Sequence, residues 1–103
     1  MFVTISIYKA KPGEEDAIIA LYEDWQRTLR PRTQGYLSGE LLRSIENARE
    51  FITILHFESQ EAAQRSTSSP EQDAWHRRLT SLIQIESAHF VCTSEWSVRE
   101  PNL

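Results

Sequence analysis

Histidine side chains are the first candidates for chemistry in this sequence. The three histidines are His56, His76 and His89, and none stands four residues from another. No cluster of histidine, cysteine or acidic residues has the spacing of metal ligands, so we expect no metal site. His76 follows Trp75 in a segment with helical apolar spacing, whereas His56 and His89 fall on predicted strands. Two interpretations of His76 stay open: it lines a cavity between helix and sheet, or its tip reaches solvent at the boundary of the core.

Aromatic residues are the second candidates, with three Trp, three Tyr and four Phe. Aromatic walls with a few hydroxyl groups and one imidazole would suit a flat, partly oxygenated organic molecule. The walls of such a pocket would come from Trp25, Tyr36 and Trp75. Its floor would be the semi-polar face of the first strand, which carries Thr4, Ser6 and Tyr8. The alternative is that these aromatic residues only form the core, and for Trp25 we favour that alternative.

Several functional classes are excluded by composition and spacing. The three glycines are isolated at positions 13, 35 and 39, so neither a phosphate-binding loop nor a G-x-S-x-G nucleophile elbow is present. The net charge is -4 and the arginine pairs lie among acidic residues, so we do not expect a nucleic-acid partner. We interpret the pairs Arg30-Pro31-Arg32 and Arg77-Arg78 as solvated helix ends.

The cellular compartment is indicated by the lone cysteine and the amino terminus. Cys92 is the only cysteine, which is typical of a protein in a reducing compartment, and we give it no catalytic role. The first residues read as a strand of the mature protein and not as a signal peptide. No apolar run approaches the roughly 20 residues of a membrane span. We therefore expect a cytoplasmic protein without membrane contact.

The predicted elements that must position these residues follow the order β-α-β-β-α-β. Strands are predicted over residues 2–9, 36–43, 50–57 and 87–98, and the first helix from the acids at 14–16 to about Arg30. The second helical region has two pieces, one capped by Ser59 and one by Ser69. In the latter, Pro70 suits the first helical position and Gln72 suits a capping box. This order indicates an α+β, ferredoxin-like four-stranded antiparallel sheet, in a single domain over residues 1–103.

Assembly is indicated by the third predicted strand, which is apolar on both alternating faces. Such a strand must be covered on both sides, but two helices cover only one side of a four-stranded sheet. The other side would be a large exposed apolar patch. A two-fold interface would cover it, so we expect a homodimer.

The sequence resembles the antibiotic biosynthesis monooxygenase family over roughly residues 2 to 98. The residues that carry the resemblance are Lys11-Pro12-Gly13 before an acidic helix start, then Gly35-Tyr36-Leu37, then Phe57-Glu58-Ser59-Gln60-Glu61-Ala62, then Ser69-Pro70-Glu71 through Trp75-His76. The resemblance implies a dimeric α/β barrel with a ligand cavity between each sheet and its helices.

The resemblance also implies an activity. Members of the family oxidise phenolic or quinol-like substrates without metal or flavin, because the deprotonated substrate itself supplies electrons to oxygen. By this resemblance we expect a monooxygenase that needs no cofactor and binds a small aromatic molecule. His76 would be its base or anion partner, Tyr8 and Tyr36 would donate hydrogen bonds, and Trp75 would shape the wall.

There are three alternatives to this activity, of which the first is disfavoured and the other two stay open. One branch of the family degrades haem with an Asn, Trp and His set, but here Ser6 or a neighbour stands at the Asn position and the Trp position falls near Ser66. We therefore do not expect haem degradation. Haem binding with His76 as axial ligand is a second alternative. The third is a non-catalytic ligand-binding or stress-response dimer on the same scaffold, because no strong catalytic set is visible.

Overall fold

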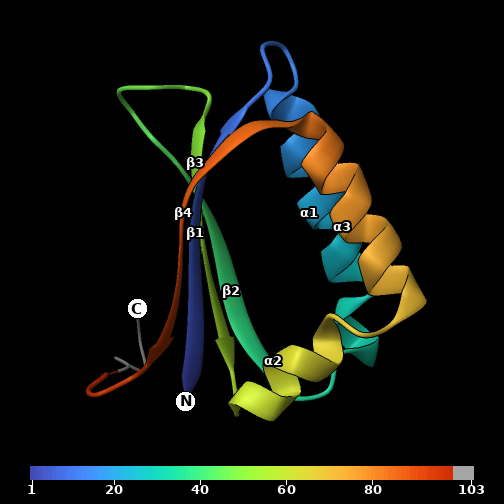
Figure 1. Ribbon diagram of the computed structural model, residues 1–103, viewed down its shortest axis with the longest axis vertical. Helices are drawn as coiled ribbons and strands as arrows, with labels where there is room; N and C mark the ends of the chain where they lie inside the picture. The colour runs from blue at the N-terminus through green and yellow to red at the C-terminus, as the bar shows by residue number, and fades with distance from the viewer. Residues whose placement is uncertain (99–103) are drawn as a thin grey trace.

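The chain alternates strands and helices in the predicted order. A computed structural model describes residues 1–98 (Figure 1). The elements are β1 (Phe2–Ala10), α1 (Glu15–Thr28), the 3₁₀ turn η1 (Arg30–Arg32), β2 (Tyr36–Arg43), β3 (Glu50–Phe57), α2 (Gln60–Ser66), α3 (Pro70–Leu82) and β4 (Ile83–Thr93). The predicted single domain also includes residues 99–103, which lie outside the described residues. None of the described helices has the length and apolar character needed to cross a membrane.

The four strands form one antiparallel sheet in the order β2-β3-β1-β4. Helices α1 and α3 lie side by side over one face, and α2 lies near the ends of β2 and β3 (Figure 1). This arrangement confirms the predicted α+β, ferredoxin-like fold.

Local signals set the helix starts. The Ser59 hydroxyl accepts a hydrogen bond from the Ala62 amide, and the Ser69 hydroxyl accepts one from the Gln72 amide, both at 3.1 Å. These bonds satisfy backbone donors that would otherwise lack partners in the first turn. Pro70 occupies the first helical position, where its fixed φ favours the helix and its missing N–H costs nothing.

The core lies between the helices and the face of the sheet that they cover. Its fully buried side chains include Ile18 of α1 and Phe51 of β3. Tyr8 of β1 is 2% exposed and stacks on Phe51, with ring centroids 6.0 Å apart. Leu79 of α3 closes the cluster. The alternation of β1 and β3 therefore sends their aromatic residues toward the helices, as the period of two requires.

A bulge in β2 changes which residues of this edge strand face the helices. Tyr36 pairs with Phe57, but Ser38 pairs with the next residue of β3, so Leu37 is the extra residue. Because paired residues share a face, Tyr36 and Gly39 both lie on the helix side although they are three positions apart.

None of the described helices covers the opposite face of the sheet. Ile5 of β1, Ile54 of β3 and Phe90 of β4 lie opposite one another in neighbouring strands on this face. The Phe90 residue is 53% exposed. Its neighbour Val91, on the helix side of the same strand, is also exposed, at 63%. The two-sided apolar character predicted for β3 is thus present, with Ile52 and Ile54 on the open face.

The last strand begins and ends earlier than predicted. The predicted strand covers residues 87–98, but β4 covers Ile83–Thr93. The sheet explains both boundaries, because β4 is an edge strand and pairs with β1 alone among the described strands. Ile83 pairs with Ala10 at one end of β1 and Thr93 with Phe2 at the other, and beyond this last pair the ladder ends with a hydrogen bond from the Ser94 amide to the Met1 carbonyl oxygen at 3.0 Å.

Candidate functional site

A cavity of about 430 Å³ lies between α1, α3 and the β2–β3 half of the sheet, and we call it the aromatic cavity. Four of the predicted site residues line it, namely Trp25, Tyr36, Trp75 and His76. The Trp25 ring centroid lies 4.9 Å from that of Tyr36 and 6.4 Å from that of Trp75. Three aromatic residues far apart in the sequence therefore form one continuous wall, of the kind that favours flat organic ligands.

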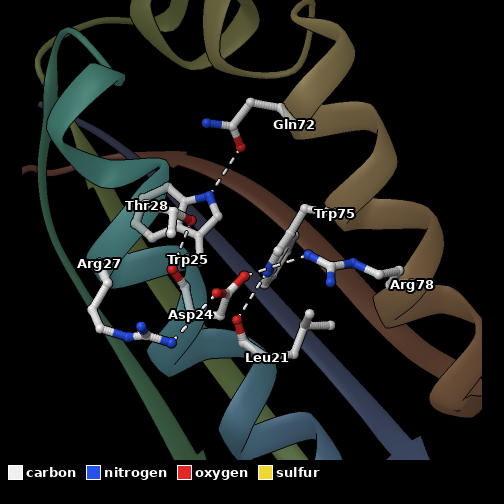
Figure 2. Close-up of polar contacts among 8 residues, drawn as sticks. All are labelled: Leu21, Asp24, Trp25, Arg27, Thr28, Gln72, Trp75 and Arg78. Atoms are coloured by element: carbon white, nitrogen blue, oxygen red, sulfur yellow. Dashed lines mark hydrogen bonds and ion pairs between the residues drawn. The ribbon is translucent and has the colours of Figure 1, made fainter.

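Hydrogen bonds hold the two tryptophan rings of this wall. The Trp75 indole N–H donates to the Leu21 carbonyl oxygen at 2.9 Å (Figure 2). The Trp25 indole N–H donates to the Gln72 carboxamide oxygen, also at 2.9 Å. Because both donors are partly or fully buried, each would pay a desolvation cost without its partner. The wall is consequently pre-formed.

Gln72 ties three segments together. Its carboxamide nitrogen donates to the Thr33 hydroxyl at 2.8 Å. Its carboxamide oxygen accepts from the Trp25 indole N–H (Figure 2). The predicted capping box required this side chain to turn back toward the backbone of Ser69. Of the two bonds of a capping box, only the one from the Gln72 backbone N–H to the Ser69 hydroxyl is present. The Gln72 carboxamide instead bonds to Trp25 of α1 and to Thr33, which follows η1.

An ion-pair pattern on the outer side links the same two helices. The Asp24 carboxylate lies 3.4 Å from guanidinium nitrogens of both Arg27 and Arg78 (Figure 2). All of these groups are substantially exposed, so the pairs contribute little stability. Only the pair with Arg78 joins α3 to α1, because Asp24 and Arg27 both belong to α1.

Tyr36 carries the hydroxyl group that is best placed to meet a ligand. Its ring lies over Gly39, where any larger residue would collide with the hydroxyl group. Burial raises the pKa of Tyr36, an effect that the nearby Arg30 guanidinium partly opposes. The phenol therefore stays protonated at neutral pH, and no hydrogen-bond partner for its hydroxyl occurs among the described residues. Its proton is available to an acceptor on a ligand.

Tyr8 and Ser6, the predicted floor residues, do not line the aromatic cavity. Tyr8 lies in the core, and its hydroxyl donates to the hydroxyl of Tyr22, which does line the cavity, at 3.0 Å. Burial raises the pKa of Tyr8 to about 12 and raises that of Tyr22 still further, so both stay neutral. The Ser6 hydroxyl lies 2.8 Å from Nδ1 of His89, on the β1–β4 side of the sheet. Ser6 thus lies outside the candidate site, and Tyr8 reaches it only through Tyr22.

The cavity also contains polar residues that sequence reasoning missed. Among them are Gln72, Asp73, Glu40 and Ser66. The Asp73 carboxylate lies 2.7 Å from the Arg77 guanidinium, an exposed pair on the next turn of α3. Asp73 stands three residues before His76, a spacing that places both on one helix face and could have signalled their proximity.

The structure places the two residues that stand at or near the asparagine and tryptophan positions of the haem-degrading set, Ser6 and Ser66. Ser6, at or beside the asparagine position, lies outside the cavity, and Ser66 donates its hydroxyl to the Ala63 carbonyl oxygen at 2.7 Å. Over residues 1–98, no three His, Cys, Asp or Glu side chains gather in a metal-binding arrangement.

Comparisons with known proteins agree with this architecture. A family model described as antibiotic biosynthesis monooxygenase matches residues 1–78. Among solved structures, a variant of SnoaB, a cofactor-independent oxygenase from Streptomyces nogalater, matches with a TM-score of 0.83 at 15% identity, covering 96% of this chain and 97% of that one. Rv0793 from Mycobacterium tuberculosis matches with a TM-score of 0.78 at 19% identity, covering 95% and 98%. A search of curated proteins finds no significant match.

Proposed function

Because the chain belongs to the antibiotic biosynthesis monooxygenase family, we propose that it is a monooxygenase for a small aromatic or quinol-like substrate. The observation that carries this proposal is the aromatic cavity itself, with His76 and Tyr36 on its lining. The likeness of the fold to SnoaB, a cofactor-independent oxygenase, supports a reaction without metal or flavin.

The proposed chemistry can balance without an external reductant. In a substrate of the anthrone type, a methylene carbon between aromatic rings reacts with O₂ to give a ketone and water. Both C–H bonds break, one oxygen atom forms the carbonyl group, and the other leaves as water with the two hydrogens. All electrons that reduce O₂ come from the substrate carbon, so the protein needs to supply only binding, proton transfer and charge stabilisation.

The residues of the cavity would divide these tasks. The rings of Trp25 and Trp75 would hold the flat substrate, and His76 would accept the proton that leaves the substrate. The neutral Tyr36 hydroxyl would donate a hydrogen bond to the oxyanion that then forms. Asp73 is the less suitable base, because its carboxylate is already paired with Arg77.

Oxygen uptake with a panel of hydroxylated anthrones and quinols tests this proposal. His76→Ala should lower kcat by about a hundredfold or more, the usual contribution of a positioned general base. His89→Ala is the matched control, because His89 is bonded to Ser6 outside the cavity, and it should retain the wild-type rate. Equal turnover by wild type and His76→Ala would remove His76 from the mechanism, and no uptake with any substrate would contradict the proposed activity.

One observation favours a second candidate, a ligand-binding protein without catalysis. His76 is exposed, and no described side chain orients its imidazole, whereas a catalytic base is usually held by another group. The same assay separates the two candidates. Ligands that quench tryptophan fluorescence with a saturable profile, but cause no oxygen uptake, would support the binding protein.

We further propose that the protein acts as a cytoplasmic homodimer that joins through the open face of the sheet. The exposed apolar side chains of that face, among them Phe90, support this proposal. Cys92 is unpaired, which is consistent with a reducing compartment.

A further inference from the structure

A second, smaller cavity of about 150 Å³ adjoins the aromatic cavity, and we call it the polar cavity. Ser66 and Gln72 line both cavities, so the two lie side by side near α2 and the start of α3. Their linings are opposite in character. The aromatic cavity has walls of tryptophan, tyrosine and leucine, whereas every residue of the polar cavity is polar.

Two guanidinium groups give the polar cavity its charge. Arg32 belongs to η1 and Arg65 to the last turn of α2, and none of the carboxylates within residues 1–98 lines the cavity with them. The chain as a whole carries a net charge of -4, so the positive charge of this cavity is opposite in sign to that of the whole protein. Arginine is the residue that best matches the planar or tetrahedral oxygens of carboxylate, sulfate and phosphate groups.

The hydrogen bonds already made within the lining leave mainly donors unused. The Ser66 and Thr33 hydroxyls have given their protons to backbone carbonyl oxygens, and both ends of the Gln72 carboxamide are bonded.

By contrast, Arg32 bonds through its Nε to the Thr28 carbonyl oxygen at 3.4 Å, and its two terminal nitrogens have no partner among the described residues. Within residues 1–98, the Arg65 guanidinium has no hydrogen-bond or ion-pair partner. The Ser69 hydroxyl accepts from the Gln72 amide and keeps its own proton. A group that only accepts hydrogen bonds is the complement of such a lining.

We propose that the polar cavity is an oxyanion-binding site for a sulfate, phosphate or carboxylate group. The group is either a free inorganic anion or a substituent of the molecule held in the aromatic cavity, whose wall the site shares. This proposal does not depend on the proposed oxygenase activity, because binding measurements alone can test both a free anion and an anionic substituent.

Inorganic sulfate is the first probe, titrated against the full-length protein at constant ionic strength and followed by NMR. The backbone amides of Arg32, Arg65 and Ser69 should shift in a saturable manner. In the double variant Arg32→Gln/Arg65→Gln the sulfate affinity should fall by about tenfold or more. The matched control Arg27→Gln/Arg77→Gln loses the same charge from exposed helix positions and should bind like wild type. Shifts that do not saturate, or equal affinities of the two double variants, would overturn the proposal.

A pair of aromatic probes then separates the two sources of the anion. If the anion is a substituent, naphthalenesulfonate should bind about tenfold more tightly than naphthol, compete with sulfate, and lose its advantage in Arg32→Gln/Arg65→Gln. If the anion is free, sulfate and naphthol should bind independently and the sulfonate should gain nothing. Both results support the site, provided that sulfate binding itself depends on the two arginines.

Discussion

At the scale of single residues, Gly39 determines how the Tyr36 ring can lie. A β-carbon at position 39 would collide with the Tyr36 hydroxyl and approach a Leu55 methyl carbon to 2.8 Å. The tyrosine hydroxyl is the free end of a side chain, so it can move without disturbing the sheet. The glycine therefore serves the shape of the aromatic cavity more than the stability of β2.

We expect Gly39→Ala to keep the fold and to weaken naphthol binding by about tenfold, because the displaced ring would enter the cavity. In a Tyr36→Ala background the same substitution should have a much smaller effect, which is the coupling that a double-mutant cycle measures. Fluorescence titration gives the affinities, and circular dichroism checks the fold. Equal losses in both backgrounds would mean that the glycine acts through the backbone and not through Tyr36.

At the scale of elements, Gln72 is the contact that joins α3 to α1 and to the turn after η1. We expect Gln72→Leu to lower the free energy of unfolding by about 1–3 kcal/mol, since it leaves the Trp25 indole N–H without its partner. The Trp25 ring should also become more mobile, which time-resolved fluorescence anisotropy would report. The control Gln64→Leu changes an exposed residue of α2 and should alter neither quantity by much. A stability change of the same size in both variants would contradict the bridging role.

The elements also differ in how far the sequence alone could predict them. The starts of α2 and α3 were predicted because Ser59, Ser69 and Pro70 act on their own first turns. The limits of β4 could not be predicted in this way, because they are set by the length of its partner β1. For the same reason the destination of the Gln72 side chain was missed, since its partners lie 47 and 39 positions away.

The candidate site shows the same division. Periodicity made Trp25, Tyr36 and Trp75 candidates for the walls of one pocket, although it favoured a core position for Trp25, and it left His76 between the cavity and the solvent. All four residues line one cavity. Ser6 shares the inward face of β1 but lies on the β1–β4 side, away from the cavity. Periodicity gives the face of a residue and not its distance along the sheet, so it could not separate Ser6 from the true lining.

At the scale of the whole molecule, the open face of the sheet allows a test of the proposed dimer. The wild-type protein should sediment at about twice the 12.0 kDa of one chain. Phe90→Lys should yield the monomer, because it places a charge in the apolar interface and loses about 1.5–3 kcal/mol of burial per chain. Val91→Lys is the matched control, since Val91 is the neighbouring exposed residue on the helix side, and it should remain a dimer. A wild-type mass of 12.0 kDa would contradict the dimer.

The bulge at Leu37 decides which face of the sheet Tyr36 occupies. Without the bulge, strict alternation over the same residues would place Tyr36 on the open face, because it stands three positions before Gly39. With Leu37 deleted, the two residues would stand two positions apart, and a regular strand would keep both on the helix side. When related sequences are compared, a tyrosine two positions before the glycine in a regular strand is therefore equivalent to one three positions before it in a bulged strand, and a gap at this position is not evidence that the tyrosine has left the cavity.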